Sequence, residues 1–219
     1  QNGLLHRDYD SPAIIYGDQF FAWYQMGVLH RNDDNPAVIY CNKYSAWYQN
    51  GLLHRDNDLP AVTCNTCYMW YKHGKCHRDN DLPAKITANQ KKWYQNGKKH
   101  RDHDRPAIVC SDGVLVWCRN GVIHRDLNMP AIMYPNGSCK WYYRGKCHRD
   151  HDQPAIIGSD GSMVWCKNGV IHRDGDFPAK IDPNGQQYWY KNGQLHREND
   201  LPAIRSEERR VGKECRSRW

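Results

Sequence analysis

The apolar residues of this chain occur in short runs that are separated by turn-forming residues. Runs such as Ile14-Ile15-Tyr16 and Val38-Ile39-Tyr40 hold only a few residues and are followed by Gly, Asn or Asp. Val, Ile, Trp and Tyr dominate them, and these residue types favour β-strands. No segment between Gly and Pro is long enough for three helical turns, and the apolar residues lack helical spacing. The pattern therefore predicts an all-β chain of short strands.

This pattern is one unit repeated nine times. His-Arg occurs at nine places from His6 to His196, at intervals of 23 or 24 residues. Gly stands three residues before each His, Pro-Ala begins six residues after it, and Trp stands seven residues before it in every unit but the first. The unit reads Trp-Tyr-x-Asn-Gly-x-x-His-Arg-Asp-x-Asp-x-Pro-Ala-x-Ile. A unit of this length cannot bury its apolar side chains alone, so we expect neighbouring units to stack.

Each unit contains two turn signals. Asn-Gly follows Trp-Tyr, as at Asn50-Gly51, and a second signal such as Asp112-Gly113 precedes the next Trp. Both dipeptides supply the positive φ angles of tight hairpin turns. We therefore predict an elongated antiparallel array of β-hairpins, and a parallel β-solenoid with one coil per unit is the alternative. A propeller blade needs about 40 residues, which is more than one unit provides.

Side-chain alternation predicts the core. The Ala after Pro, the residue two places after that Ala, the residue before His, and Trp are apolar in most units, as at Ile39 and Leu53. The place directly after Ala holds Lys85 and Lys180 in two units, so we expect it to face water.

The array occupies residues 1–204 as a single domain and is cut within a unit at both ends. Residues 205–219 share nothing with the unit and resemble the translated read-through of a short-read sequencing adapter, so we interpret them as a non-native tail. A basic arm that binds an acidic surface is the alternative. Without these residues the net charge falls from +7 to +4 and the number of cysteines becomes odd.

The unit resembles a known repeat family. Trp47-Tyr48-Gln49-Asn50-Gly51-Leu52-Leu53-His54 is similar to the core of MORN-type repeats, which are β-hairpin repeats of comparable length. The Arg-Asp-x-Asp-x-Pro-Ala stretch after His differs from the usual MORN unit, which has Gly there, and is similar to a divergent subgroup found in viruses, phages and bacteria. The resemblance implies a scaffold or interaction role and, for some members, contact with a membrane surface.

The Asp-x-Asp pairs could bind a cation, because carboxylates two residues apart can chelate Ca²⁺. An Arg beside every pair competes for these carboxylates. We therefore favour a structural role in which the Asp side chains close the turn before Pro and pair with Arg of the same or the next unit. The candidate cation ligands are Asp56, Asp58, Asp79, Asp81, Asp102, Asp104, Asp150 and Asp152.

The Trp, His and Arg of the units form our candidate interaction and structural ladder. Arg could stack on the Trp of an adjacent unit, and His could bind metal or form structural hydrogen bonds. We favour the structural roles, since equivalent His residues would lie about 10 Å apart. The ladder comprises Trp23, Trp47, Trp70, Trp93, Trp117, Trp141, Trp165, Trp189, His30, His54, His77, His100, His124, His148, His172, Arg55, Arg78, Arg101, Arg125, Arg149 and Arg173.

Enzyme classes receive little support. His-Arg-Asp-Leu at His124 matches part of a kinase catalytic loop, but the chain has no Gly-rich loop and no Asp-Phe-Gly, and no unit carries a unique nucleophile and base. The Asp beside each Arg weakens the basic footprint that nucleic acid requires. The scattered Cys residues favour a reducing compartment, and Cys64-Asn-Thr-Cys67 has no second pair to complete a zinc site. We therefore expect a non-enzymatic scaffold without a cofactor, which binds a protein or a surface.

Overall fold

The computed structural model describes residues 3–41 and 43–206, and in this part of the chain every regular element is a β-strand. All strand pairings in it are antiparallel, which confirms the hairpin array and makes the parallel solenoid wrong. The described residues hold no helix able to span a membrane. The chain divides into two compact units, Gln1–Gly113 with Trp117–Gly121, and Val114–Val116 with Val122–Trp219. Most of the tail that we interpret as non-native, residues 207–219, lies outside the described residues.

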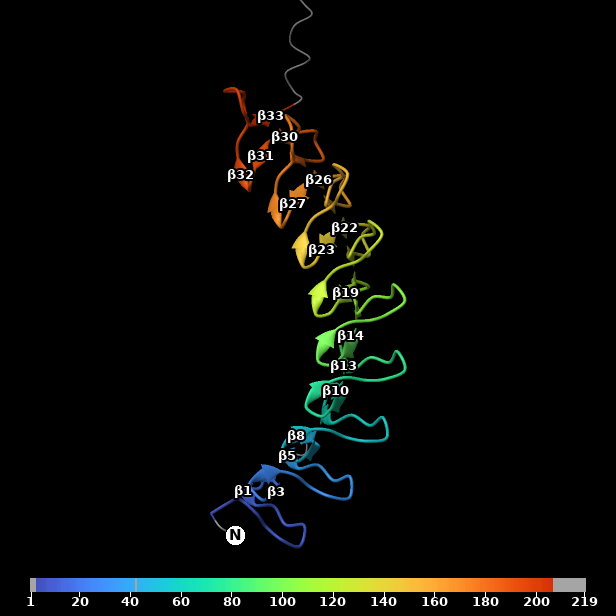
Figure 1. The fold of residues 1–219 in the computed structure, drawn as a ribbon, viewed down its shortest axis with the longest axis vertical. Coiled ribbons are helices and arrows are strands. Elements are labelled where there is room, and N and C mark those ends of the chain that lie inside the picture. Colours follow the sequence, from blue (N-terminus) through green and yellow to red (C-terminus); the bar gives the residue numbers. More distant parts are fainter. Residues whose placement is uncertain (1–2, 42, 207–219) are drawn as a thin grey trace, which may run out of the picture. The chain divides into compact units, whose positions relative to one another are not determined.

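From here on, one copy of the repeated sequence is called a repeat, and unit means one of the two compact units. The first unit contains a meander in which each three-residue strand pairs with the next along the chain (Figure 1). Its strands are β1 (Ile14–Tyr16), β2 (Phe20–Ala22), β5 (Val38–Tyr40), β6 (Tyr44–Ala46), β9 (Val62–Cys64), β10 (Cys67–Met69), β13 (Lys85–Thr87), β14 (Gln90–Lys92) and β17 (Ile108–Cys110).

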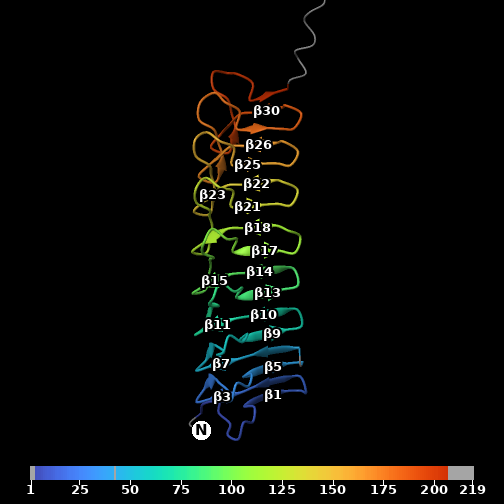
Figure 2. The same ribbon diagram turned by 90° about the vertical axis from the view of Figure 1, so that its right-hand side faces the viewer.

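Short hairpins form a second row beside this meander (Figure 2). They are β3–β4 (Tyr24–Gln25 and Val28–Leu29), β7–β8 (Tyr48–Gln49 and Leu52–Leu53), β11–β12 (Tyr71–Lys72 and Lys75–Cys76) and β15–β16 (Tyr94–Gln95 and Lys98–Lys99), and β19 (Cys118–Arg119) is the last strand of the first unit.

The second unit is built in the same way. Its meander consists of β18 (Leu115–Val116), β21 (Ile132–Met133), β22 (Cys139–Lys140), β25 (Ile156–Ile157), β26 (Met163–Val164), β29 (Lys180–Ile181), β30 (Gln187–Tyr188) and β33 (Ile204–Arg205). The hairpin strands beside its meander are β20 (Val122–Ile123), β23–β24 (Tyr142–Tyr143 and Lys146–Cys147), β27–β28 (Cys166–Lys167 and Val170–Ile171) and β31–β32 (Tyr190–Lys191 and Gln194–Leu195).

The short hairpins turn at the predicted Asn-Gly. Asn50 and Gly51 have φ angles of +49° and +78°, as the tight turns that match the twist of a hairpin require. Met26, His73 and Arg144 take the Asn place in other repeats with nearly the same φ. The sequence signal for the turn was therefore correct even where the preferred residue is replaced.

The core contains the predicted Ala and Trp, but the place directly after Ala, which we expected to face water, is not exposed in the described repeats before the last one. The Ala after Pro is completely buried in each repeat from Ala37 to Ala179. Val62 and Ile132, at the place we expected to face water, are only 4% and 9% exposed, whereas Ile15 at the predicted core place is 54% exposed.

The short hairpins explain this error. Around Trp141, Ala155 and Cys166, the partly buried Ile156, Ile157 and Val164 of the meander pack together with Cys147 and Ile171 of the short hairpins. The residue directly after Ala therefore lies inside, between strand and hairpin. Lys is tolerated there in β29 because the Lys180 ammonium reaches Asp182 at 2.9 Å and lies 4.7 Å from the centre of the Tyr188 ring.

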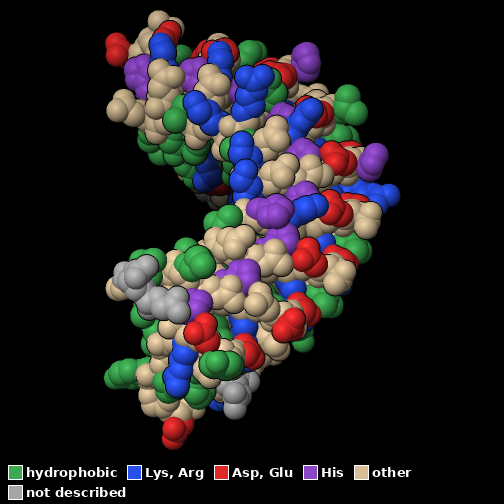
Figure 3. All heavy atoms as spheres, turned by 60° about the horizontal axis from the view of Figure 1, so that its bottom comes forward, with side chains coloured by type: hydrophobic (Ala, Val, Ile, Leu, Met, Phe, Trp, Pro, Cys, Tyr) green, Lys and Arg blue, Asp and Glu red, His purple; other side chains and the backbone are tan. Residues whose placement is uncertain are grey.

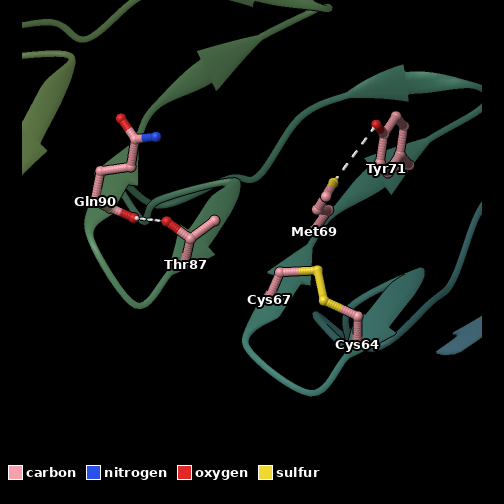
Figure 4. Close-up of a disulfide and its surroundings, with 6 residues drawn as sticks. All are labelled: Cys64, Cys67, Met69, Tyr71, Thr87 and Gln90. Atoms are coloured by element: carbon pink, nitrogen blue, oxygen red, sulfur yellow. Dashed lines mark hydrogen bonds between the residues drawn. A yellow bond between two sulfur atoms is a disulfide. The ribbon is translucent and has the colours of Figure 1, made fainter. Parts of the chain in front are cut away.

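A disulfide joins Cys64 and Cys67 across the turn between β9 and β10 (Figure 4). Met69 and Tyr71 lie just beyond it, with the Tyr71 hydroxyl 4.0 Å from the Met69 sulfur. The other cysteines of the described residues have free thiols. The Cys-x-x-Cys pair that we considered for zinc thus consists of two sulfurs bonded to each other.

The buried Ala places make a first prediction. We expect Ala84→Leu to lower the free energy of unfolding by about 1–3 kcal/mol, because the completely buried Ala84 leaves no room for a larger side chain. The matched control is Ala88→Leu at an exposed turn, which we expect to change stability by less than about 0.5 kcal/mol. Urea unfolding of the two variants measures this, and equal losses would contradict the packing account.

Candidate interaction surface

The Arg of the His-Arg pair lies over a Trp ring at Arg31, Arg55, Arg78, Arg101, Arg149, Arg173 and Arg197. The guanidinium carbon is 3.7–3.9 Å from the ring centre for the first-unit pairs and 3.9–4.0 Å for those of the second unit. The Trp belongs to the same repeat, as in Arg55 over Trp47, so our expectation of an adjacent repeat was wrong. The short hairpin between them reverses the chain direction and brings Arg55 back beside Trp47. The backbone N–H of His54 donates to the Trp47 carbonyl at 3.1 Å.

The same guanidinium also joins two repeats. Arg55 donates from Nε and Nη2 to the two carboxylate oxygens of Asp34 in the preceding repeat, at 2.7 and 2.8 Å. Its Nη1 donates to the Pro60 carbonyl of its own repeat at 3.3 Å. The indole N–H of Trp47 donates to the Asp34 backbone carbonyl at 2.9 Å. One Arg and one Trp thus hold the loop of the preceding repeat at two points.

We name this arrangement the Arg clamp: an Arg stacked on its own Trp and paired with the second Asp of the preceding repeat. The described clamps with a two-oxygen pair are Arg31–Asp10, Arg55–Asp34, Arg78–Asp58, Arg101–Asp81, Arg173–Asp152 and Arg197–Asp176. In each of these clamps the Arg hydrogen bonds hold the pKa of the Asp carboxyl below its ordinary value.

The backbone conformation also favours Asp at the second Asp position of the repeat. Asn57 and Asp58 both have left-handed φ angles, +56° and +54°, before the Pro. Asn and Asp tolerate this conformation better than other non-glycine residues. The local turn therefore turns the Asp58 carboxylate toward the next repeat, where it meets Arg78.

The His side chains link neighbouring repeats, because each from His6 to His172 accepts a hydrogen bond from a backbone N–H of the next repeat. Nδ1 of His54 accepts the backbone N–H of His73 in the next repeat at 3.1 Å. A nitrogen that accepts a hydrogen bond carries no proton, so the neutral ring has its proton on Nε2, which donates to Asp56 at 3.1 Å. Equivalent bonds to the first Asp of the same repeat occur at His6, His77, His100, His124, His148 and His172.

These pairs place a row of carboxylates at the surface. The His side chains are only 7–19% exposed, whereas the Asp side chains that they hold are 58–72% exposed. Histidine and acidic side chains recur side by side within each unit in Figure 3. We call the row within each compact unit a carboxylate row; its members are Asp8, Asp56, Asp79 and Asp102 in the first unit, and Asp126, Asp150 and Asp174 in the second.

The two carboxylates of each Asp-x-Asp pair serve different partners. Asp56, Asp79, Asp102 and Asp150 pair with His of their own repeat, and Asp58, Asp81 and Asp152 pair with Arg of the next repeat. The backbone carbonyl of Asp104 accepts the indole N–H of Trp117 at 3.0 Å. Within the described ranges no three His, Cys, Asp or Glu side chains gather closely enough to hold a metal ion. A calcium ion would have to displace a guanidinium.

Open clefts separate neighbouring loops in the second unit. Three clefts of about 260–340 Å³ lie between the His-Arg-Asp stretch of one repeat and the Trp-Tyr and His-Arg-Asp stretches of the next. Leu127, Tyr143 and Phe177 line them and are well exposed. The clefts are open and repeated rather than single and enclosed.

Sequence reasoning found the Trp, His and Arg of the ladder, and its expectation that Asp pairs with Arg of the same or the next repeat is confirmed for the next repeat; it placed the Trp of the stack in the wrong repeat. The clamp partners Asp10, Asp34 and Asp176 were not among the candidates. The second Asp of a repeat precedes the Arg of the next repeat by 20 or 21 residues, and this regular spacing could have identified them as partners. Arg125 and Arg149 also donate to the Pro carbonyl of their own loops, a backbone contact without a sequence signature.

No protein-family model and no curated protein matches this chain. The resemblance to MORN-type repeats therefore stays a prediction that rests on the residues of the repeat.

One repeat carries Asn128 at the place where the clamp has its Asp, and this difference allows a test of the clamp. Asn128 accepts only one hydrogen bond from Arg149, at 3.0 Å, and burial lowers the pKa of this Arg. We expect Asn128→Asp to raise the free energy of unfolding by up to about 1 kcal/mol, because the carboxylate supplies charge and a second acceptor. Asp152→Asn, the reverse change one repeat later, should lower it by a similar amount. Thermal and urea unfolding measure both, and the same sign for the two variants would contradict this account.

The clamp also predicts acid sensitivity. A carboxyl whose folded pKa lies below its unfolded value stabilises the fold above about pH 4, and this contribution is lost as the pH falls through the folded pKa. We therefore expect stability to decrease below about pH 4, and Asp58→Asn to make this decrease shallower. Fluorescence-monitored unfolding between pH 6 and 2 measures the slope. Asp18→Asn at an exposed turn is the control and should keep the wild-type slope.

Proposed function

We propose that this chain is a non-enzymatic repeat scaffold that binds an extended, cationic protein segment along the carboxylate row. The observation that carries the proposal is the repetition of one exposed carboxylate, held by one largely buried His, at the same place in successive repeats. A partner that contacts one repeat meets an equivalent group in the next repeat.

The hydrogen bonding of the ladder supports a binding role over catalysis. Both nitrogens of His54 are engaged, one by a backbone N–H and the other by Asp56. Arg55 is engaged by Asp34, Pro60 and the Trp47 ring. General acid–base chemistry needs a group free to exchange a proton with a substrate, and these side chains are committed to the fold.

The spacing of the row selects the conformation of the partner. Each repeat adds two strands at about 4.8 Å, so neighbouring carboxylates lie roughly 10 Å apart. Three residues of polyproline II helix advance about 9.3 Å, whereas side chains on one face of an extended strand recur at about 6.7 Å. A polyproline II segment with Lys or Arg at every third residue therefore matches the row repeat by repeat.

Several weak contacts in one partner give strong binding. An exposed ion pair contributes about 0–1 kcal/mol alone, but contacts within one segment share a single cost of association. Affinity should therefore rise steeply with the number of repeats that a partner spans.

The proposal predicts binding of a matched peptide. We expect a peptide of three Lys-Pro-Pro triplets, matched to Asp56, Asp79 and Asp102 of the first unit, to bind the full chain at least about tenfold more tightly than a peptide of the same composition with its Lys in one block. Asp56→Asn/Asp79→Asn/Asp102→Asn should remove most of this preference. The variant should fold, because Asn32 naturally occupies the equivalent place and accepts from His30 at 2.9 Å. Isothermal titration calorimetry at low salt measures the affinities.

Two outcomes would overturn the proposal. Equal binding of the matched and block peptides, unchanged in the triple variant, would show that only net charge matters. A large rise in the unfolding temperature with Ca²⁺, reversed by EDTA and absent in the triple variant, would instead favour the cation-binding alternative. Asp18→Asn is the control for a general loss of negative charge and should bind as the wild type does.

A further inference from the structure

One repeat of the first unit departs from its neighbours between the long strands and the short hairpin. Lys85, directly after the buried Ala84, stands where Val62 lies in the preceding repeat. Lys92, directly before Trp93, stands where other repeats have the buried Ala22 and Ala46 or Met69, and Lys99, directly before His100, stands where they have Leu29, Leu53 or Cys76. Three inward places that are apolar in the preceding repeats are cationic in this one.

These three lysines lie near one another. Lys85 of β13 and Lys92 of β14 are directly opposite in the antiparallel ladder, and Lys99 of β16 pairs with Tyr94, two residues after Lys92. Each of the three is half-buried. Burial lowers the pKa of Lys92, and the charges of Lys99 and Lys85 lower it further. Like charges that face each other across a ladder destabilise a sheet.

The fold supplies no countercharge for them. In the part of the chain that the structure describes, none of Lys85, Lys92 and Lys99 forms a salt bridge, and residues 85–99 contain no Asp or Glu. Lys167 and Lys180 of the second unit are each paired with an Asp at 2.6 and 2.9 Å. Lys140, which takes the place of Lys92 in the second unit, has no carboxylate partner among the described residues but lies 5.3 Å from the centre of the Tyr134 ring. What sets the repeat of Lys85, Lys92 and Lys99 apart is that three such lysines occur together.

Two further lysines extend the cluster along the hairpins. Lys75 and Lys98 take the exposed place where preceding repeats have Val28 and Leu52. A Cβ at Gly97 would lie 3.8 Å from the Lys75 Cβ, so Lys75 borders the turn that Lys98 follows. Lys75 and Lys98 therefore add positive charge on the exposed side of the hairpins, next to the repeat that holds the three half-buried lysines.

We propose that Lys85, Lys92 and Lys99 form a binding site for a multiply charged phosphate group. Bound between the three ammonium groups, such an anion replaces their mutual repulsion by attraction. Lys binds phosphate as a compact charge, and three ammonium groups offer donors in several directions, which suits a tetrahedral oxyanion better than a planar carboxylate. The site lies at the short hairpins and is independent of the carboxylate row.

The test is the response of the full chain to pyrophosphate at constant ionic strength, adjusted with NaCl. We expect pyrophosphate to raise the unfolding temperature of the wild type and to bind with about one molecule per chain in calorimetry. Lys92→Met and Lys99→Met should each weaken binding at least about tenfold. Lys92→Met should fold, because Met69 occupies the equivalent place, and it should unfold at a higher temperature than the wild type without anion, since repulsion is removed.

Lys43→Met is the matched control, because Lys43 lies at an exposed turn of the same unit. It should keep the full response to pyrophosphate. A second arm uses phosphatidylcholine vesicles with and without phosphatidic acid. Binding to the phosphatidic acid vesicles that depends on Lys92, with no response to pyrophosphate, would identify a lipid headgroup as the source of the phosphate. A response equal to that of NaCl, or equal in Lys92→Met and wild type, together with no vesicle binding, would overturn the proposal.

Discussion

The guanidinium of one Arg in each repeat is the interaction on which the array depends. Arg78 shows the complete arrangement: it stacks on the Trp of its own repeat, donates to the Pro carbonyl of its own loop and holds both oxygens of an Asp in the preceding repeat. A repeat of this length has too little apolar surface to fold by itself, so its stability comes from its neighbours. The Arg clamp makes that dependence specific, because the planar fork of Arg fits one carboxylate in one orientation.

The two Asp residues of a repeat have different roles: one stabilises the fold and the other is exposed at the surface. The second Asp joins neighbouring repeats through Arg, and the first Asp is held by His and faces solvent, as Asp58 and Asp56 show. Because His54 also accepts a backbone N–H from the next repeat, each exposed carboxylate is tied to the stacking of the array. A row with fixed spacing follows from the packing itself, and a partner that binds it does not have to order it first.

A strict repeat also makes departures from it informative. Asn128 weakens one clamp, and the lysines of β13, β14 and β16 place uncompensated charge where the preceding repeats are apolar. Such a departure lowers stability without an evident gain in the fold, and proteins tolerate it most often at functional sites. The carboxylate row is common to many repeats and suits an extended partner, whereas the lysine cluster belongs to one place and suits a small anion.

The sequence determined the repeat, the hairpin turns and the buried Ala and Trp, because these depend on local geometry: Asn50-Gly51 accepts positive φ, and Pro-Ala recurs at one register. It also identified the side chains of the ladder. Their partners required the tertiary structure, since Arg55 finds its Trp within the repeat and its Asp in the preceding one, a choice made by how the short hairpin returns the chain. The facing of Val62 was mistaken for the same reason. Alternation along a strand gives two faces, but only packing against the hairpins decides which of them is inside.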